Sequence, residues 1–308
     1  MELLSDCLVD AATLGYEQLA VSGGEPLIYT PLPDLLARAR ELSMVTTITS
    51  NGMLLTPRRW EPLAELVDVL AISIDGTPEE HDEIRRREGA FAQTTANLEV
   101  VRSSGTPFGL IFTLTQYNAD SLEFVVRHAA DEGARSVQVH PLTLVGRAAG
   151  TMSGARPDEL ELAAALWEAA RLGHELGVVV HVDAITADQL LEHRDALVPR
   201  RPVTELTTVA PVLIVDADAV VIPMTHDVNS SLRLGSLRET GLATLAAEWL
   251  AAGAGDRLAV ACEHTWVNLT RASAPLAVYW YDEVAALTRD RAPLPDVPRA
   301  LELVPALC

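Results

Sequence analysis

The chain has 308 residues, of which 49% are hydrophobic, and its formal net charge at pH 7 is −20. An acidic chain repels nucleic acid and anionic membranes, so neither is expected as a partner. All 23 basic residues are arginine, which excludes a Schiff-base mechanism and the lysine of a phosphate-binding loop. We see no stretch long and apolar enough for a membrane helix and no basic leader, so a cytoplasmic location is expected.

Up to about Gly150, short apolar runs alternate with longer amphipathic stretches. The periodicity predicts strands at 18–22, 45–49, 69–74, 109–114 and 136–140. Helices are predicted at 2–15, 32–41, 60–66, from Glu79, at 94–103 and at 121–132. Strands that are apolar throughout and separated by helices indicate a parallel sheet covered by helices.

After Gly150 the pattern changes. Helices are predicted at 157–176, 187–196 and 242–250, a further strand is possible at 178–182, and 211–224 alternates like a β-hairpin. The tail from Ala292 is proline-rich and is expected to be loosely ordered. We expect three regions with soft boundaries, at 1–155, 156–203 and 204–308.

Polar residues gather where each of the first five predicted strands ends. They are Ser22-Gly23-Gly24-Glu25, Thr49-Ser50-Asn51-Gly52, Ser73-Ile74-Asp75-Gly76, Thr113 with Thr115, and His140-Pro141. In a β/α barrel the carboxyl ends of the strands share one rim, and that rim carries the active site. The sequence therefore predicts a site at this rim.

In order and spacing, these motifs resemble those of the radical S-adenosylmethionine (SAM) enzymes, particularly peptide-modifying members with a SPASM-type C-terminal domain. The resemblance extends to His81-Asp82-Glu83-Ile84-Arg85 with Gly89 and Phe91, and to Gly146-Arg147-Ala148. It implies an α/β fold, a partial (β/α) TIM-like barrel lacking its first strand. A small α+β appendage would follow at the C-terminus.

The resemblance also implies a cofactor site for SAM. Gly23, Gly24 and Glu25 would receive the amino group of its methionine part, with Pro26 closing the motif. The other implied contacts are Ser50 and Asn51 on the cofactor side of the rim, Ser73 and Asp75 at the ribose or carboxylate, and His140 and Pro141 beside the adenine.

Each of these residues also has a purely structural interpretation. Glu25 would cap the helix that follows it, Asp75-Gly76 would form a turn, and the Ser73 hydroxyl would bond to the backbone. His140 would be a core histidine, and Arg85 is as well explained by a structural ion pair as by a site.

Radical SAM enzymes hold a [4Fe–4S] cluster with a Cys-x3-Cys-x2-Cys loop, and this chain has no such motif. Its three cysteines, Cys7, Cys262 and Cys308, stand far apart, so no metal ligand is assigned. We expect the first strand and the cluster loop to lie upstream of Met1, which would leave residues 18–22 at the edge of the sheet. In the appendage, Met224 stands where a cluster-binding cysteine would be expected.

The sequence is thus identified as a radical SAM protein that modifies a peptide or a small metabolite. The alternative is a cluster-free pseudoenzyme that serves as a SAM- or peptide-binding scaffold. A metal-free lyase or aldolase is disfavoured because the chain has no lysine. Tyr117, Tyr281 and Cys262 are candidates for directing a substrate radical, but structural roles explain all three more simply.

Overall fold

The fold is taken from a computed structural model that describes residues 1–144, 152, 154–271 and 274–289. The predicted motif Gly146-Arg147-Ala148 and the tail from Ala292 lie outside these ranges.

Strands between residues 18 and 182 form a six-stranded, wholly parallel sheet in the order β1-β2-β3-β4-β5-β6. Its strands are β1 (Gln18–Val21), β2 (Val45–Ser50), β3 (Val69–Ser73), β4 (Phe108–Leu114), β5 (Ser136–Pro141) and β6 (Val179–Val182). All five predicted strands are confirmed, and the possible strand at 178–182 joins them as β6. The prediction that β1 stands at the sheet edge is also confirmed.

The two faces of the sheet differ because successive side chains point to opposite sides of a strand. Ile72, Phe112 and Val139 are fully buried beneath the outer helices. The residues that directly follow these three in the chain are Ser73, Thr113 and His140. They are only half-buried and face the inside of the curved sheet. The register pairs Ser73 with Ile111 and Thr113 with His140, so these side chains reach the same rim.

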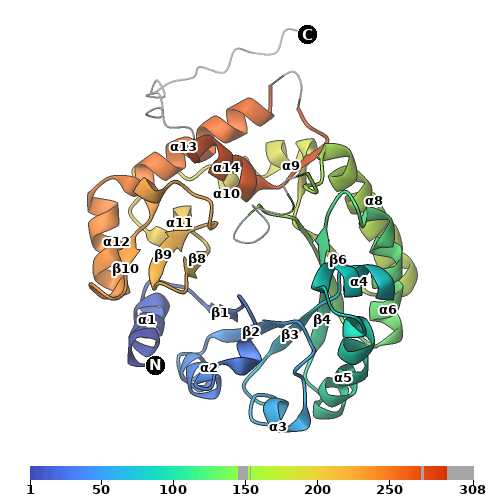
Figure 1. Cartoon of the computed structure of the whole chain (residues 1–308). Helices are drawn as coiled ribbons and strands as arrows, with labels where there is room; N and C mark the ends of the chain where they lie inside the picture. The colour runs from blue at the N-terminus through green and yellow to red at the C-terminus, as the bar shows by residue number, and fades with distance from the viewer. Residues whose placement is uncertain (145–151, 153, 272–273, 290–308) are drawn as a thin grey trace.

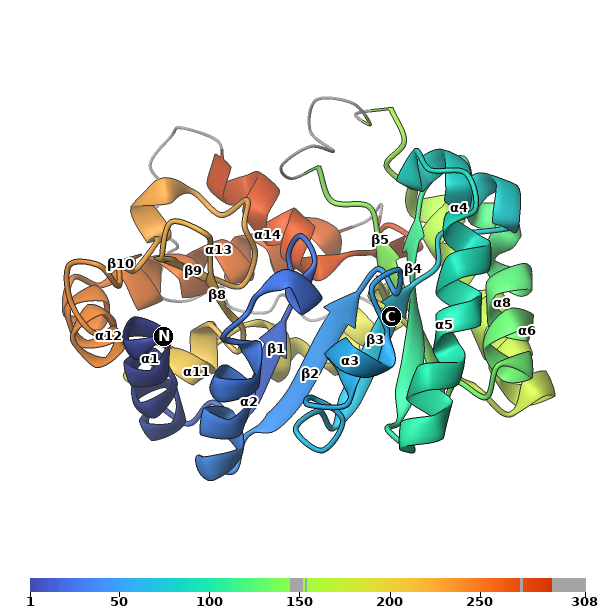
Figure 2. The same ribbon diagram turned by 60° about the horizontal axis from the view of Figure 1, so that its bottom comes forward.

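Helices follow the strands and cover the outer face. They are α1 (Glu2–Thr13), η1 (Pro26–Ile28), α2 (Leu32–Glu41), α3 (Pro57–Trp60), α4 (Pro78–Arg85), α5 (Ala90–Ser104), η2 (Ala119–Ser121), α6 (Leu122–Asp131) and α8 (Glu159–Leu176). Figure 2 shows α5, α6 and α8 outside β4 and β5. This α/β arrangement is the predicted partial barrel.

The helix predicted at 60–66 is wrong. A short helix, α3, ends at Trp60, and turns follow as far as Leu66. Pro62 has no N–H to donate to the carbonyl of Arg58, so α3 does not continue as a regular helix.

The C-terminal part begins with α9 (Ala187–Glu192) and α10 (Arg194–Leu197), which divide the helix predicted at 187–196. Further elements are β7 (Ile185–Thr186), α11 (Leu206–Val209), β8 (Leu213–Val215), β9 (Val220–Pro223), η3 (Ser230–Leu232), β10 (Gly235–Ser236), α12 (Leu242–Ala251), α13 (Ala254–Leu269), β11 (Ala277–Val278) and α14 (Trp280–Arg289). The β8–β9 hairpin is confirmed. Sequence patterns did not reveal α13 and α14.

Figure 1 shows the curved sheet and the C-terminal elements together forming a ring, in which β8–β10 and α12–α14 occupy the side between β1 and β6. One hydrophobic core lies between the sheet and its outer helices. A second core joins α1, through Cys7, to the C-terminal elements. The three predicted regions stay a prediction. Across the described ranges, we find no helix with the length and hydropathy needed to cross a membrane.

Candidate functional site

Glu25 joins the ends of β1 and β2. Its carboxylate accepts hydrogen bonds from the Ser50 hydroxyl at 2.9 Å and from the Asn51 N–H at 2.9 Å. It also accepts from the Leu27 N–H at 3.1 Å, which caps η1. Glu25 therefore caps the helix that follows it, as its structural interpretation predicts, and the same hydrogen bonds fix the carboxylate at the rim.

Gly23 and Gly24 lie exposed beside this carboxylate. The φ of Gly23 is +115°, a backbone conformation that residues other than glycine rarely adopt. A Cβ atom built on either glycine would have no heavy atom within 4 Å. Pro26, which follows Glu25, is buried and opens η1. The turn after β1 thus leaves space at the rim for a ligand to approach the backbone.

Asp75 follows β3 and is only 3% exposed. Its carboxylate accepts from Nε of Arg85 at 2.6 Å, so the ion-pair interpretation of Arg85 is correct. Burial alone would raise the pKa of Asp75, but the hydrogen bonds and charges of His81 and Arg85 outweigh it and lower that pKa. Nδ1 of His81 lies 3.4 Å from the Asp75 carboxylate and 3.2 Å from the Asp75 backbone nitrogen. Asp75 is therefore an ionised anchor for the loop after β3.

A residue that sequence reasoning missed, Asn118, ties this loop to the next strand. Its side-chain amide donates to the carbonyl of Asp75 at 2.8 Å and to that of Thr113 at 3.0 Å. Its Oδ1 accepts from the N–H and the hydroxyl of Thr115. Ser73 ends β3 half-buried on the inner face. The structure thus does not join Asp75 to the Glu25 cluster directly.

His140 lies near the end of β5, where its Nδ1 is 2.8 Å from the Asp183 carboxylate. Its ring also meets Tyr279 edge-on, with 5.4 Å between the ring centroids. Asp183 and Tyr279 were not predicted, because they stand 43 and 139 residues away and only the fold brings them together. His140 is therefore not a fully buried core residue.

Comparisons with known proteins identify a domain within this chain. The family model of the radical SAM superfamily matches residues 8–129, which span α1 to α6. These residues of the chain therefore form a radical SAM domain.

Two curated relatives show how much of such proteins this chain covers. The pre-heme d1 synthase of Dinoroseobacter shibae is 30% identical over 209 residues, covering 65% of this chain and 52% of the relative. The PqqA peptide cyclase of Ruegeria pomeroyi is 32% identical over 158 residues, covering 51% and 42%. The chain therefore spans about half the length of these relatives.

Solved structures share the radical SAM fold at low sequence identity. Native anSMEcpe with bound AdoMet matches with a TM-score of 0.60 and 16% identity, over 93% of this chain and 85% of its own. Streptococcus suis SuiB bound to S-adenosylmethionine matches with a TM-score of 0.60 and 14% identity, over 79% and 57%. These likenesses establish the fold, while the roles of individual rim residues stay predictions.

The two cysteines within the described residues, Cys7 and Cys262, do not fit the iron–sulfur cluster of the superfamily. Cys7 and Cys262 are buried in the second core. Burial raises the pKa of Cys7 to about 11, helped by the charge of Asp10, and burial raises that of Cys262 to about 12. Such thiols stay protonated, whereas a cluster is held by thiolates. No group of three or more His, Cys, Asp or Glu in the described part of the chain is arranged to hold a metal.

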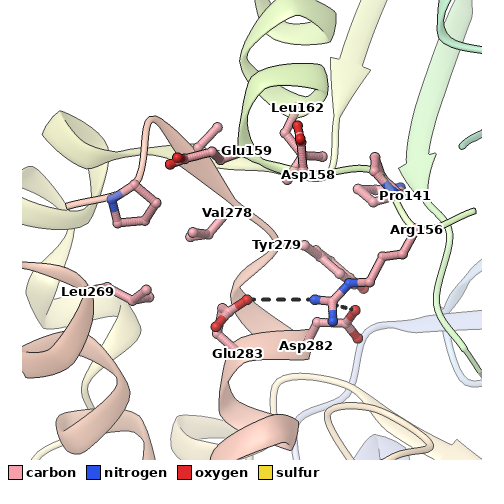
Figure 3. A pocket seen from close by; sticks show the side chains of 13 residues that line it. Pro141, Arg156, Asp158, Glu159, Leu162, Leu269, Val278, Tyr279, Asp282 and Glu283 are labelled. Atoms are coloured by element: carbon pink, nitrogen blue, oxygen red, sulfur yellow. Dashed lines mark ion pairs between the residues drawn. The ribbon is translucent and has the colours of Figure 1, made fainter. Parts of the chain in front are cut away.

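A cavity of about 320 Å³ lies next to the end of β5 (Figure 3). Pro141 lines it, together with apolar side chains from α8 and the C-terminal elements, among them Leu162, Leu269 and Val278. At one side Arg156 pairs with Asp282 at 3.1 Å and with Glu283 at 3.6 Å. Burial raises the pKa of both carboxyl groups, and the charge of Arg156 opposes that rise. The cavity thus combines an apolar wall with a charged edge.

Proposed function

We propose that this chain is the SAM-binding and substrate-holding part of a radical SAM protein that modifies a peptide or a small metabolite. One observation carries the proposal. The Glu25 carboxylate is fixed at the rim by donors from β2, beside two glycines with open space around them. A carboxylate and exposed backbone carbonyls suit the amino group of an amino acid. Ser50 and Asn51 would orient the carboxylate, and Ser73 would face the cofactor from β3.

The substrate class follows from relatives and from the cavity. The relatives' names include a peptide cyclase and a pre-heme d1 synthase, so both peptides and small metabolites occur among similar proteins. A cavity of about 320 Å³ lies within the range of small-ligand pockets. Its size suits one peptide side chain or a small metabolite.

In this proposal the cluster ligands come from a segment outside these 308 residues, because Cys7 and Cys262 are buried and protonated and the sequence has no Cys-x3-Cys-x2-Cys motif. We derive no chemical step through the cluster. Reading the coding DNA upstream in frame tests this part: a Cys-x3-Cys-x2-Cys motif would support it. A stop codon shortly before Met1 with no such motif would contradict it.

A second candidate is a cluster-free scaffold that binds SAM or a peptide. The burial of Cys7 and Cys262 favours it, since neither thiol is available to a metal. Anaerobic iron–sulfur reconstitution of any longer native chain separates the two. An enzyme should turn brown and release 5′-deoxyadenosine from SAM under reducing conditions, whereas a scaffold should stay colourless.

Binding of SAM to the chain itself tests the site. Gly24 lies outside the left-handed region, and its Cβ would enter open space, so Gly24→Val should fold normally and block the ligand. We expect calorimetric titration with SAM to show at least a tenfold loss of affinity, or about 1.4 kcal/mol. The control is Glu17→Val, an exposed change just before β1, which should bind like the unchanged chain. Equal affinity of Gly24→Val and the control for SAM would contradict the proposal that SAM binds at this rim.

A further inference from the structure

Asp183 connects three side chains on the inner face of the sheet. It directly follows β6, where its N–H donates to the carbonyl of Val139 at 2.9 Å. Its carboxylate lies 2.8 Å from Nδ1 of His140 and accepts from the Gln138 amide at 2.9 Å. His181 lies on its other oxygen, with Nε2 at 3.2 Å. The side chain of Asp183 is 16% exposed, so its carboxylate is shielded from most of the solvent.

The contact with Asp183 assigns the proton of the neutral His140 ring. A carboxylate only accepts, so Nδ1 must carry the hydrogen and Nε2 is left with a lone pair. In the described parts of the chain we find no hydrogen-bond partner for Nε2. The side chain of His140 is 33% exposed. His140 therefore presents a proton acceptor to the space enclosed by the curved sheet and the C-terminal elements.

The acceptor stands beside the cavity described above. Tyr279, whose ring meets that of His140 edge-on, lines the cavity, whereas His140 itself lies behind that ring and outside the lining. Tyr281 packs edge-on against Tyr279 at 6.0 Å between ring centroids. Asp183, His181 and Asp282 are the charged or titratable neighbours, together with these two tyrosines. Burial raises the pKa of Tyr279, so its hydroxyl stays protonated.

We propose that His140 is a catalytic proton acceptor for a substrate group held in this cavity, and that Asp183 is its positioning residue. The group is a hydroxyl or an ammonium of the substrate. The O–H or N–H bond of this group breaks and its electron pair stays on the oxygen or nitrogen, while the Nε2 lone pair of His140 forms the new N–H bond. The imidazolium that results is stabilised by Asp183. The inference rests on the proposed function in one respect only, that the substrate enters the space enclosed by the curved sheet and the C-terminal elements.

Nitrogen NMR of the histidine rings in the full chain tests the acceptor directly. The unchanged protein should show His140 with hydrogen on Nδ1 and a free lone pair on Nε2, with His140→Gln identifying its signals. Asp183→Ala should shift the ring toward the form with hydrogen on Nε2. The matched control is Gln138→Ala, which removes another donor to Asp183 and should leave the His140 signals unchanged. A hydrogen on Nε2 in the unchanged protein would overturn the proposal whether or not Asp183→Ala folds.

Acylation by diethyl pyrocarbonate, whose carbonyl carbon is attacked by the lone pair of an unprotonated imidazole nitrogen, tests access to Nε2 and separates this inference from the SAM site. Mass spectrometry should find the adduct on His140 both without and with saturating S-adenosylhomocysteine. Absence of the adduct in the free chain would overturn the proposal. Protection by S-adenosylhomocysteine would overturn it too, and would place His140 beside the adenine, in support of SAM binding. An unprotected adduct in a chain that fails to bind SAM would support His140 as the acceptor and contradict the proposed cofactor site.

Discussion

The two rim carboxylates, on Glu25 and Asp75, are held in different ways. Glu25 is half-buried and accepts from a hydroxyl and two backbone N–H groups, all neutral donors. Asp75 is nearly fully buried and accepts from the Arg85 guanidinium. Breaking a buried ion pair by removing one partner is strongly destabilising. Asp75 should therefore matter more for folding than for binding.

Replacing Asp75 by Asn should destabilise the chain in a pH-dependent way. The folded pKa of Asp75 lies below its ordinary value of 3.8, so its charge stabilises the fold above that pH. This contribution is lost as the pH falls through the lowered folded pKa. At about pH 7 we expect Asp75→Asn to cost about 3 kcal/mol of unfolding free energy. Urea unfolding at about pH 7 and about pH 3 should show the difference between the two proteins shrinking in acid; a constant difference would contradict the ion-pair account.

At the scale of elements, β4 and β5 approach each other so closely at Gly109 that no side chain fits. A Cβ there would lie 2.5 Å from Oγ of Ser136 and 2.9 Å from its carbonyl oxygen. The carbonyl belongs to the backbone of β5, so it cannot rotate away as a side chain would. Gly109 thus sets the spacing of the two strands whose far ends carry Thr113 and His140.

We expect Gly109→Ala to lower the unfolding free energy by about 1–3 kcal/mol, the usual cost of forcing an extra methyl group into a packed interior. Gly24→Ala is the matched control, because its Cβ meets no atom within 4 Å and should change stability little. Urea unfolding of both variants measures the effect. Equal stability of the two would show that the strands separate at little cost.

Strand positions were predictable because each strand is an apolar run with a polar end. The same patterns indicated the cluster of Glu25, Ser50 and Asn51, whose partners follow adjacent strands. They could not indicate Asp183 as the partner of His140, since that contact depends on the register of β5 and β6. The helix prediction at 60–66 overlooked Pro62, which cannot donate a helical hydrogen bond. The α13 helix was missed because helical spacing alone does not show which face is buried.

At the scale of the whole molecule, the N-terminal helix packs against the C-terminal core through Cys7 and against α2 through Leu8. Asp10 of α1 accepts from the N–H of Ala243 in α12 at 2.9 Å. The hydroxyl of Tyr16 donates to the carbonyl of Ala210 at 2.7 Å, although 194 residues separate them. Contacts of this range couple the two ends of the described chain, so we expect α1 to unfold with the C-terminal elements and not by itself.

Cys7 in α1 and Cys262 in α13 report on this coupling, because both are buried in the second core. Their raised pKa values, about 11 and about 12, make both thiols unreactive toward iodoacetamide in the folded protein near neutral pH. Labelling in rising urea, followed by mass spectrometry of the two peptides, should show both becoming reactive at the same urea concentration. Labelling of Cys7 well before Cys262 would mean that α1 detaches first. A shared midpoint is what the second core requires, since leaving Cys7 exposed would uncover the face of α12 on which α1 packs.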